Sequence, residues 1–248
     1  MVAAEPFPEA AVLSARVGVA GWSIPTALAD RFADDGTHLE RYARVFDCVE
    51  INSSFHRPHR RTTYERWAAS VPAGFRFAVK VPKAITHERR LVDCPDLLAR
   101  FADEAGGLGE RRGPTLVQLP PSLAFDPSVA ARFFDDLAGS LAGPIVCEPR
   151  HPSWFEAAAD ALLTAHHIAR VAADPARVAG ADRPGGWSGL RYMRWHGAPQ
   201  VYRSAYDDAV IDRHADAARC GESWTIYDNT AAGAAPANAL TLMARLAG

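Results

Sequence analysis

Short apolar runs alternate with longer amphipathic segments along most of this sequence. Runs of four to seven residues rich in Val, Ile and Phe are typical of buried strands, and apolar residues three and four apart are typical of helices. The runs predict strands over 17–20, 48–52, 75–81, 115–119, 145–148, 168–172, 190–195 and 223–228. The other segments predict helices near 38–46, 62–70, 96–105, 127–141, 154–166, 208–219 and 237–246.

This order predicts an α/β fold, a single (β/α)8 TIM-barrel-like domain with a parallel sheet. About eight strand-then-helix units fit the usual length of such a barrel, roughly 250 residues. A doubly wound sheet is disfavoured because no G-x-G-x-x-G or P-loop follows the first strand. The Gly- and Pro-rich segment 178–189 is expected to be a loop in place of the sixth helix. We expect an N-terminal tail over 1–15 and one domain over 16–247.

Composition narrows the classes of function. With 48% hydrophobic residues the chain can bury a sizeable core, and its net charge of −2 shows no global basic footprint for nucleic acid. No apolar run approaches the roughly 20 residues of a membrane span, so no membrane partner is expected. The four cysteines are widely spaced and form no C-x-x-C pair, which suits a reducing compartment and predicts a cytoplasmic protein.

Polar side chains follow most of the predicted strands. In a TIM barrel the C-terminal strand ends share one rim, where active sites lie. Because residues two apart in a strand share a face, Val49 and Ile51 are expected to face the helices, whereas Glu50, Lys80 and Arg194 face the barrel axis. The polar or aromatic residues at these strand ends are Trp22, Ser23, Glu50, Asn52, Lys80, Lys83, Gln118, Glu148, Arg150, His151, Asp174, Arg194, His196, Asp228 and Asn229.

Buried unlike charges are costly unless they are paired, which leaves two interpretations of this rim. In the first, Glu50, Lys80, Glu148 and Arg194 form a structural ring of ion pairs that closes the barrel mouth. In the second, the rim is an acid–base site with Glu50, Glu148 and His196 as catalytic residues. The substrate-binding residues of that site would be Trp22, Asn52, Lys80, Lys83, Gln118, Arg150, His151, Arg194 and Asn229.

The placement of the lysines supports the second interpretation. Lys80 and Lys83 are the only lysines among 27 basic residues, and both lie at the end of one predicted strand. A bias towards Arg codons explains their scarcity but not their shared position. A lysine ammonium is a compact charge whose pKa shifts readily, unlike a guanidinium, so it suits a site for a phosphate or carboxylate.

A divalent metal site is a further alternative. Carboxylates with an imidazole suit hard or borderline divalent ions, and Glu50, Glu148, Asp174 and His196 would supply them. These residues come from separate strands and share no local spacing. No metal ligand is therefore assigned, and no motif implies another cofactor.

Nucleic acid is an alternative partner. Two basic segments, His56–Arg61 and Thr86–Arg90, follow the second and third predicted strands. Nearby aromatic residues could stack on bases, as in proteins that bind single strands; they are Phe55, Trp154, Tyr202 and Tyr206. The simpler interpretation is that these charged loops are solvated.

Motifs at the strand ends resemble those of one family. They are Gly18–Ser23 (GVAGWS), Glu50–Phe55 (EINSSF), Phe77–Lys83 (FAVKVPK), Gln118–Pro121 (QLPP), Glu148–Trp154 (EPRHPSW), Tyr192–Gly197 (YMRWHG) and Asn229 followed by Ala237–Ala239 (ANA). In this order they are similar to the YecE-like TIM-barrel family, domain of unknown function 72. The resemblance covers about Arg16 to Leu246 and implies a (β/α)8-like barrel without naming a reaction.

Two positions depart from that family's pattern. Asp228 precedes Asn229 where family members carry two Asn after an aromatic residue, so Asn229 is preferred as the site residue. Pro149 stands where the family more often has an aromatic residue.

The leading hypothesis is an enzyme of the hydrolase, lyase or isomerase type that acts on a small anionic, phosphorylated or carboxylated substrate by acid–base chemistry. A serine nucleophile is disfavoured because no G-x-S-x-G motif is present. The alternatives are a barrel that binds or processes nucleic acid and a noncatalytic ligand-binding scaffold. The oligomeric state is left open.

Overall fold

Strands and helices alternate along residues 15–248, the part of the chain that the computed structural model describes. The strands are β1 (Ala15–Val19), β2 (Cys48–Ile51), β3 (Arg76–Lys80), β4 (Arg112–Gln118), β5 (Ile145–Glu148), β6 (Ile168–Arg170), β7 (Ala172–Asp174), β8 (Gly185–Gly186), β9 (Arg191–Trp195) and β10 (Ser223–Tyr227). The α-helices are α1 (His38–Ala43), α2 (Ser53–His56), α3 (Arg61–Ala69), α4 (Pro95–Gly106), α5 (Pro127–Ser140), α6 (Ala157–Ala165), α7 (Asp208–Ala218) and α8 (Ala235–Ala247).

Each predicted strand and helix is present, with ends that differ by a few residues. The predicted loop 178–189 holds only the short strand β8, which pairs antiparallel with β6. Residues 1–14 of the predicted tail lie outside the described residues, and Ala15 already belongs to β1. None of the described helices is long and apolar enough to cross a membrane.

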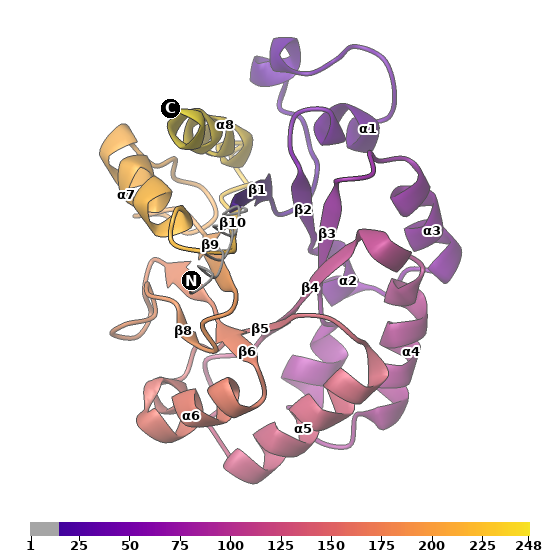
Figure 1. Ribbon diagram of the computed structural model, residues 1–248, viewed down its shortest axis with the longest axis vertical. Helices are drawn as coiled ribbons and strands as arrows, with labels where there is room; N and C mark the ends of the chain where they lie inside the picture. Colours follow the sequence, from indigo (N-terminus) through magenta and orange to yellow (C-terminus); the bar gives the residue numbers. More distant parts are fainter. Residues whose placement is uncertain (1–14) are drawn as a thin grey trace, which may run out of the picture.

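The strands form two parallel ladders that meet at both edges. One ladder has the order β2–β3–β4–β5–β6 and the other β1–β10–β9–β7. β6 and β7 are consecutive pieces of one stretch, and a bridge between Ala20 and Glu50 joins β1 to β2. The strand order therefore returns to its start, as expected for a TIM-barrel-like fold. Figure 1 shows the helices around the outside of the strands, with α7 beside α8.

The seam between β1 and β2 depends on a glycine and a tyrosine. A Cβ on Gly18 would lie 2.3 Å from the carbonyl oxygen of Cys48, so a side chain at this position would push the two strands apart. The Tyr42 hydroxyl donates to that same carbonyl at 2.9 Å and accepts from the Val19 N–H at 2.9 Å. Helix α1, which carries Tyr42, is thereby tied to both strands.

The apolar residues separate into an outer and an inner core. Val49, Ile51 and Phe77 belong to the outer core, between the strands and the helices. Cys48 and Ala78, their neighbours in sequence, belong to the smaller inner core inside the strands. The predicted alternation is confirmed, because strand side chains point in turn to opposite faces.

Candidate active site

A layer of polar side chains covers the inner core at the C-terminal ends of the strands. Each of its members lies two positions after another inward residue; Glu50 follows Cys48, and Lys80 follows Ala78. The strand period therefore raises these side chains one layer above the apolar ones. We call this set the polar layer; all its members are buried, and they are Glu50, Lys80, Gln118, Glu148, Arg194, His196 and Asp228.

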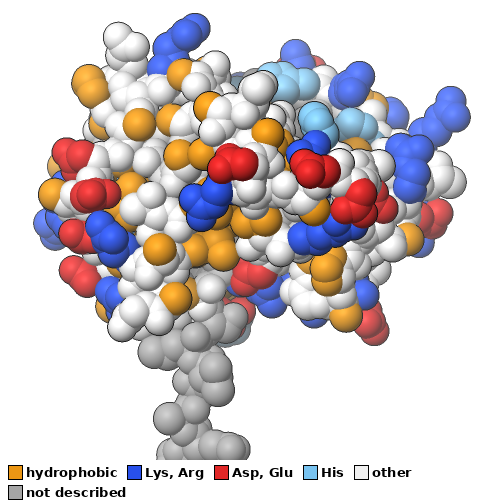
Figure 2. All heavy atoms as spheres, turned by 90° about the horizontal axis from the view of Figure 1, so that it is seen from above, with side chains coloured by type: hydrophobic (Ala, Val, Ile, Leu, Met, Phe, Trp, Pro, Cys, Tyr) orange, Lys and Arg blue, Asp and Glu red, His pale blue; other side chains and the backbone are white. Residues whose placement is uncertain are grey.

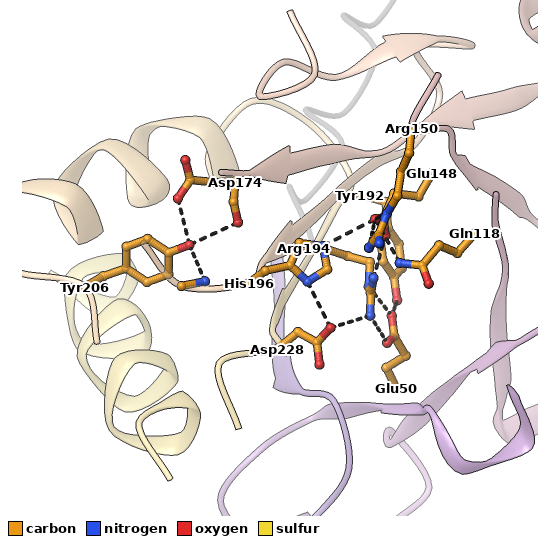
Figure 3. A network of polar contacts seen from close by, with 11 residues as sticks. Glu50, Gln118, Glu148, Arg150, Asp174, Tyr192, Arg194, His196, Tyr206 and Asp228 are labelled. Atoms are coloured by element: carbon orange, nitrogen blue, oxygen red, sulfur yellow. Dashed lines mark hydrogen bonds and ion pairs between the residues drawn. The ribbon is translucent and has the colours of Figure 1, made fainter. Parts of the chain in front are cut away.

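Arg194 is the centre of the polar layer (Figure 3). Its Nε and Nη2 donate to the two oxygens of Glu50 at 3.0 and 2.8 Å. Nη2 also donates to Asp228 at 2.9 Å, and Nη1 donates to Glu148. The side chain is fully buried. All three guanidinium nitrogens therefore donate to carboxylates. Burial lowers the pKa of Arg194, but the three carboxylates outweigh it and raise that pKa above its usual range.

Glu148 collects the largest number of donors. One of its oxygens accepts from Gln118 at 2.9 Å and from Arg150 at 2.8 and 3.0 Å, and lies 3.3 Å from Nε2 of His196. Burial opposes ionisation, but Arg194, His196 and Arg150 outweigh it and hold the pKa of Glu148 well below its usual range. Glu148 is therefore an ionised carboxylate at neutral pH.

His196 lies between two carboxylates. Its Nδ1 is 2.9 Å from Oδ2 of Asp228, and its Nε2 contacts Glu148. Burial disfavours the imidazolium, but Glu148 and Asp228 outweigh it and raise the pKa of His196. Burial likewise opposes ionisation of Asp228, yet Arg194, His196 and Lys80 lower its pKa. Of this pair, the imidazole is therefore the group that holds and releases the proton, while Asp228 stays ionised.

Lys80 differs from the rest of the layer. Its ammonium lies 4.0 Å from the centroid of the Phe55 ring, and 5% of the residue is exposed. The ammonium itself makes no hydrogen bond or ion pair within residues 15–248. Burial and Arg194 lower the pKa of Lys80 to about 8, against the opposing charges of Glu50, Glu148 and Asp228.

Comparison with known proteins agrees with this architecture. Residues 16–248 match the model of a family described as "Protein of unknown function DUF72". The chain belongs to the DUF72 family. This confirms the family resemblance of the sequence motifs and, with the solved structures below, the TIM-barrel-like fold.

The chain is similar to two relatives of this family and, in fold alone, to one more distant structure. UPF0759 protein YecE of Escherichia coli K12 is 34% identical over 120 residues, 48% of this chain and 43% of that protein, so the match covers less than half of its length. A DUF72 family crystal structure from Thermotoga maritima MSB8 has a TM-score of 0.75 at 22% identity, covering 94% of this chain and 99% of that one. A sugar phosphate isomerase/epimerase from Parabacteroides distasonis has a TM-score of 0.53 at 11% identity, with 95% and 97% covered, which concerns the fold alone.

Not all of the site residues predicted from the strand ends join the network in this DUF72 protein. Trp22 packs edge-on against Trp67, with ring centroids 5.0 Å apart. Lys83 pairs with Glu88 at 3.3 Å and is half-exposed. Asn52 is half-buried at the end of β2, and its Oδ1 has no described partner. These three residues lie outside the hydrogen-bonded layer, and their substrate-binding roles stay predictions.

Two other expected residues organise turns of this DUF72 chain. His151 accepts the Ser153 N–H on Nδ1 at 3.3 Å and so caps the short 3-10 helix Pro152–Phe155. Asn229 donates to the Ser204 carbonyl and to Asn238, both at 2.9 Å. Their substrate-binding roles stay predictions, for which the structure supplies a structural alternative.

Asp228 is the member of the layer to which the sequence analysis gave no role. The departure from the family pattern made it doubtful, whereas the structure places it between Arg194 and His196. The strand period was the signal that could have found it, because Ile226 is an inner-core residue two positions earlier. Tyr192 was likewise not assigned, although its hydroxyl donates to Glu50 at 2.9 Å.

The proposed metal ligands do not come together as a set. Asp174 accepts from the Tyr206 hydroxyl at 2.8 Å, away from the layer in Figure 3. Glu50 is bonded to Arg194 and Tyr192. Over residues 15–248, no group of three or more His, Cys, Asp or Glu side chains is arranged to hold a metal ion.

The loops after β2 and β3 bring aromatic and basic residues to the rim. The Phe55 ring lies 5.0 Å from the rings of both His56 and His87, on the same ring that Lys80 contacts. Burial, followed by the charges of Lys80 and Arg150, lowers the pKa of His87. Figure 2 shows histidine side chains gathered in one area of the face in view, with Lys and Arg beside them.

The space around the layer is limited. A cavity of about 20 Å³ is lined by Glu148, Arg150 and His196, with Arg177 from the loop after β7. That is room for roughly one water molecule. A second cavity of about 180 Å³ lies at the ends of β1 and β10, between Ala20 and Thr230.

Proposed function

We propose that this protein is an enzyme that acts on a small phosphorylated or carboxylated substrate at the C-terminal mouth of the barrel. The observation that carries the proposal is Lys80, a residue only 5% exposed whose ammonium forms no ion pair with any side chain of residues 15–248. A buried charge that lacks a partner costs stability, so its presence favours a ligand that supplies the opposite charge. Arg150, with 15% of its side chain exposed, provides a second positive group at the mouth.

His196, together with Glu148 and Asp228, acts as the general acid and base. The imidazolium is the donor, because Glu148 and Asp228 raise its pKa above that of an ordinary histidine, and the imidazole that remains is the base. Arg194 holds Glu148 and Asp228 in place, because it donates a hydrogen bond to each of them. Glu50 in turn positions Arg194 by accepting two of its hydrogen bonds. The distant structural neighbour described as a sugar phosphate isomerase/epimerase shares the fold, and a phosphorylated substrate is compatible with it.

Thermal unfolding with candidate anions tests this proposal. A ligand that binds the folded state raises the melting temperature, by an amount set by its concentration relative to its dissociation constant. We expect phosphorylated sugars or small carboxylates to raise the melting temperature of the wild-type protein but not of Arg150→Met or Lys80→Met. Equal shifts in all three proteins would contradict binding at this mouth. The substrate must also displace loop residues such as Arg177, because the cavity is small.

Nucleic acid is a second candidate, favoured by the stacking of Phe55 with two histidines on a basic rim. Binding of a single strand there would weaken steeply as salt rises, since phosphate contacts release counter-ions. Arg57→Gln and Arg60→Gln, both in the exposed loop, should reduce the salt slope. A flat slope in the wild type would argue against this candidate.

A noncatalytic scaffold is a third candidate. It is favoured by the complete pairing of Arg194 and by the small cavity. In that case Lys80→Met would leave all ligand binding unchanged.

A further inference from the structure

Lys80 is the one charged member of the polar layer that bonds to no other side chain described in residues 15–248. Its backbone is fixed, because the Ser54 hydroxyl donates to the Lys80 carbonyl at 2.7 Å. Ser54 belongs to α2, the helix that also carries Phe55, so this hydrogen bond ties α2 to the end of β3; the Phe55 ring lies 4.0 Å from the ammonium. The amine thus lies against an aromatic ring at the mouth, and no carboxylate of residues 15–248 pairs with it.

This environment makes the amine chemically available. Arg194 repels its positive charge, and burial removes water from it. With a pKa of about 8, about one Lys80 in ten is neutral at pH 7, against fewer than about one ordinary lysine in a thousand. A neutral amine in an apolar contact is a nucleophile towards carbonyl carbon.

We propose that Lys80 forms an imine with a small aldehyde or ketone that carries a phosphate or carboxylate. This rests on the proposed function and deepens it, because it names a carbonyl group as part of the substrate. Arg150 holds the anionic end, and Lys80 acts on the carbonyl end. An electron-poor imine carbon favours loss of a neighbouring proton or cleavage of a neighbouring C–C bond, which points to a lyase or isomerase.

The step balances without any further reagent. The Lys80 nitrogen forms a bond to the carbonyl carbon, and the C=O π electrons move to oxygen, which takes a proton from His196. The nitrogen returns a proton to the His196–Asp228 pair. In a second transfer His196 protonates the hydroxyl, which leaves as water while the C=N bond forms, and the nitrogen gives its remaining proton back to His196. The sum is amine plus carbonyl compound giving imine plus water, with no oxidation and no net proton.

Reductive trapping tests this step on the full chain, and the sequence makes it unusually selective. Lys80 and Lys83 are the only lysines, so apart from the N-terminal amine each is the other's control. Lys83 is half-exposed and paired with Glu88. Glyceraldehyde 3-phosphate, dihydroxyacetone phosphate and pyruvate serve as probes, with uncharged glyceraldehyde for comparison. Cyanoborohydride converts an imine to a stable amine, which peptide mass spectrometry locates.

We expect at least one anionic probe to label Lys80 about tenfold faster than Lys83, in the wild type and in Lys83→Arg. Lys80→Arg should remove this fast labelling, and glyceraldehyde should react more slowly than its phosphate. Labelling of Lys80 no faster than Lys83 with every probe would overturn the imine.

Thermal shifts with inorganic phosphate and with the same probes separate the two proposals. If the shifts remain without fast labelling, the anion site stands and the imine is wrong. If labelling of Lys80 is fast with and without the anionic group, the imine stands and the anion site is wrong.

Discussion

Arg194 and Glu50 share two hydrogen bonds, of 2.8 and 3.0 Å, although 144 residues separate them in the sequence. Both side chains are fully buried. The pair joins β9 to β2 across the barrel, and Arg194 extends it to Glu148 on β5 and to Asp228 after β10. A single guanidinium therefore ties together carboxylates from three separate parts of the barrel.

Loss of Arg194 should destabilise the protein strongly. Arg194→Met leaves three buried carboxylates without their main partner, and breaking a buried pair of this kind costs about 3–5 kcal/mol. Urea denaturation at pH 7 measures the free energy of unfolding. The control is Arg100→Met, whose side chain is 63% exposed; its i,i+4 pair with Glu104 is of a kind worth about 0.3–0.5 kcal/mol. Similar losses in both variants would contradict the central role of Arg194.

The same variant should change the dependence of stability on pH. In the wild type the pKa values of Glu148 and Asp228 are lowered, so their contribution is present above pH of about 4 and is lost as pH falls through the folded-state values. Without Arg194 these carboxylates protonate more readily in the folded state. We expect the free energy of unfolding of Arg194→Met to fall furthest below that of the wild type at neutral pH, and the difference to shrink in acid. Urea denaturation between pH 3 and pH 7 measures it.

Removal of the Lys80 amine should stabilise the protein. The folded-state pKa of Lys80 is about 8 against an ordinary 10.5, so the unfolded chain binds this proton more tightly than the folded protein does. The ammonium therefore lowers the free energy of unfolding, and this destabilisation is complete below pH 8. Lys80→Met should gain about 1–3 kcal/mol at pH 7, and the gain should fade as pH rises towards 10.5. Lys83→Met, on the half-exposed neighbour, should change little. A destabilised Lys80→Met would show that the ammonium is satisfied in the folded protein.

Asp228 should control the protonation of His196. Asp228→Asn removes one of the two carboxylates that raise the pKa of His196, so that pKa should fall. In the wild type the stabilisation from the imidazolium is complete below about pH 6.5 and is lost as pH rises through the folded-state value; the variant should lose it at lower pH. Nitrogen NMR of His196 measures the shift. Asp216→Asn, on the exposed face of α7, is the control, and an unchanged titration in Asp228→Asn would refute the coupling.

Gly18 should not tolerate even a methyl group. Gly18→Ala would place Cβ 2.3 Å from the Cys48 carbonyl oxygen, and overpacking of this kind costs about 1–3 kcal/mol or more. Gly139→Ala in α5 has open space around it and should be neutral or stabilising, because Ala favours a helix. Thermal unfolding compares the two. Equal melting temperatures would mean that the β1–β2 seam can open without cost.

The order of strands and helices was predictable because each segment carries its own periodicity. Val49 and Ile51 alternate with Cys48 and Glu50, and the structure places these pairs in the outer and inner faces as expected. The same period predicts that Lys80 and Arg194 point inward. Asp228 fits the rule equally well, but the family pattern of two asparagines favours Asn229, whose side chain instead donates to the Ser204 carbonyl.

What this sequence determined is the fold class and the ring of strand ends, because periodicity and strand length are local properties. Only the tertiary structure decided which charges are paired. The partners of Arg194 lie 34, 46 and 144 residues away, and their geometry depends on how the barrel closes at Gly18. That closure gives Arg194 three carboxylates and pairs Lys80 with none of those in residues 15–248. Lys80 is the residue that distinguishes a structural ring from a reactive site, because a ring would pair it with a carboxylate. Whether it is paired depends on tertiary distances, which no local sequence pattern encodes.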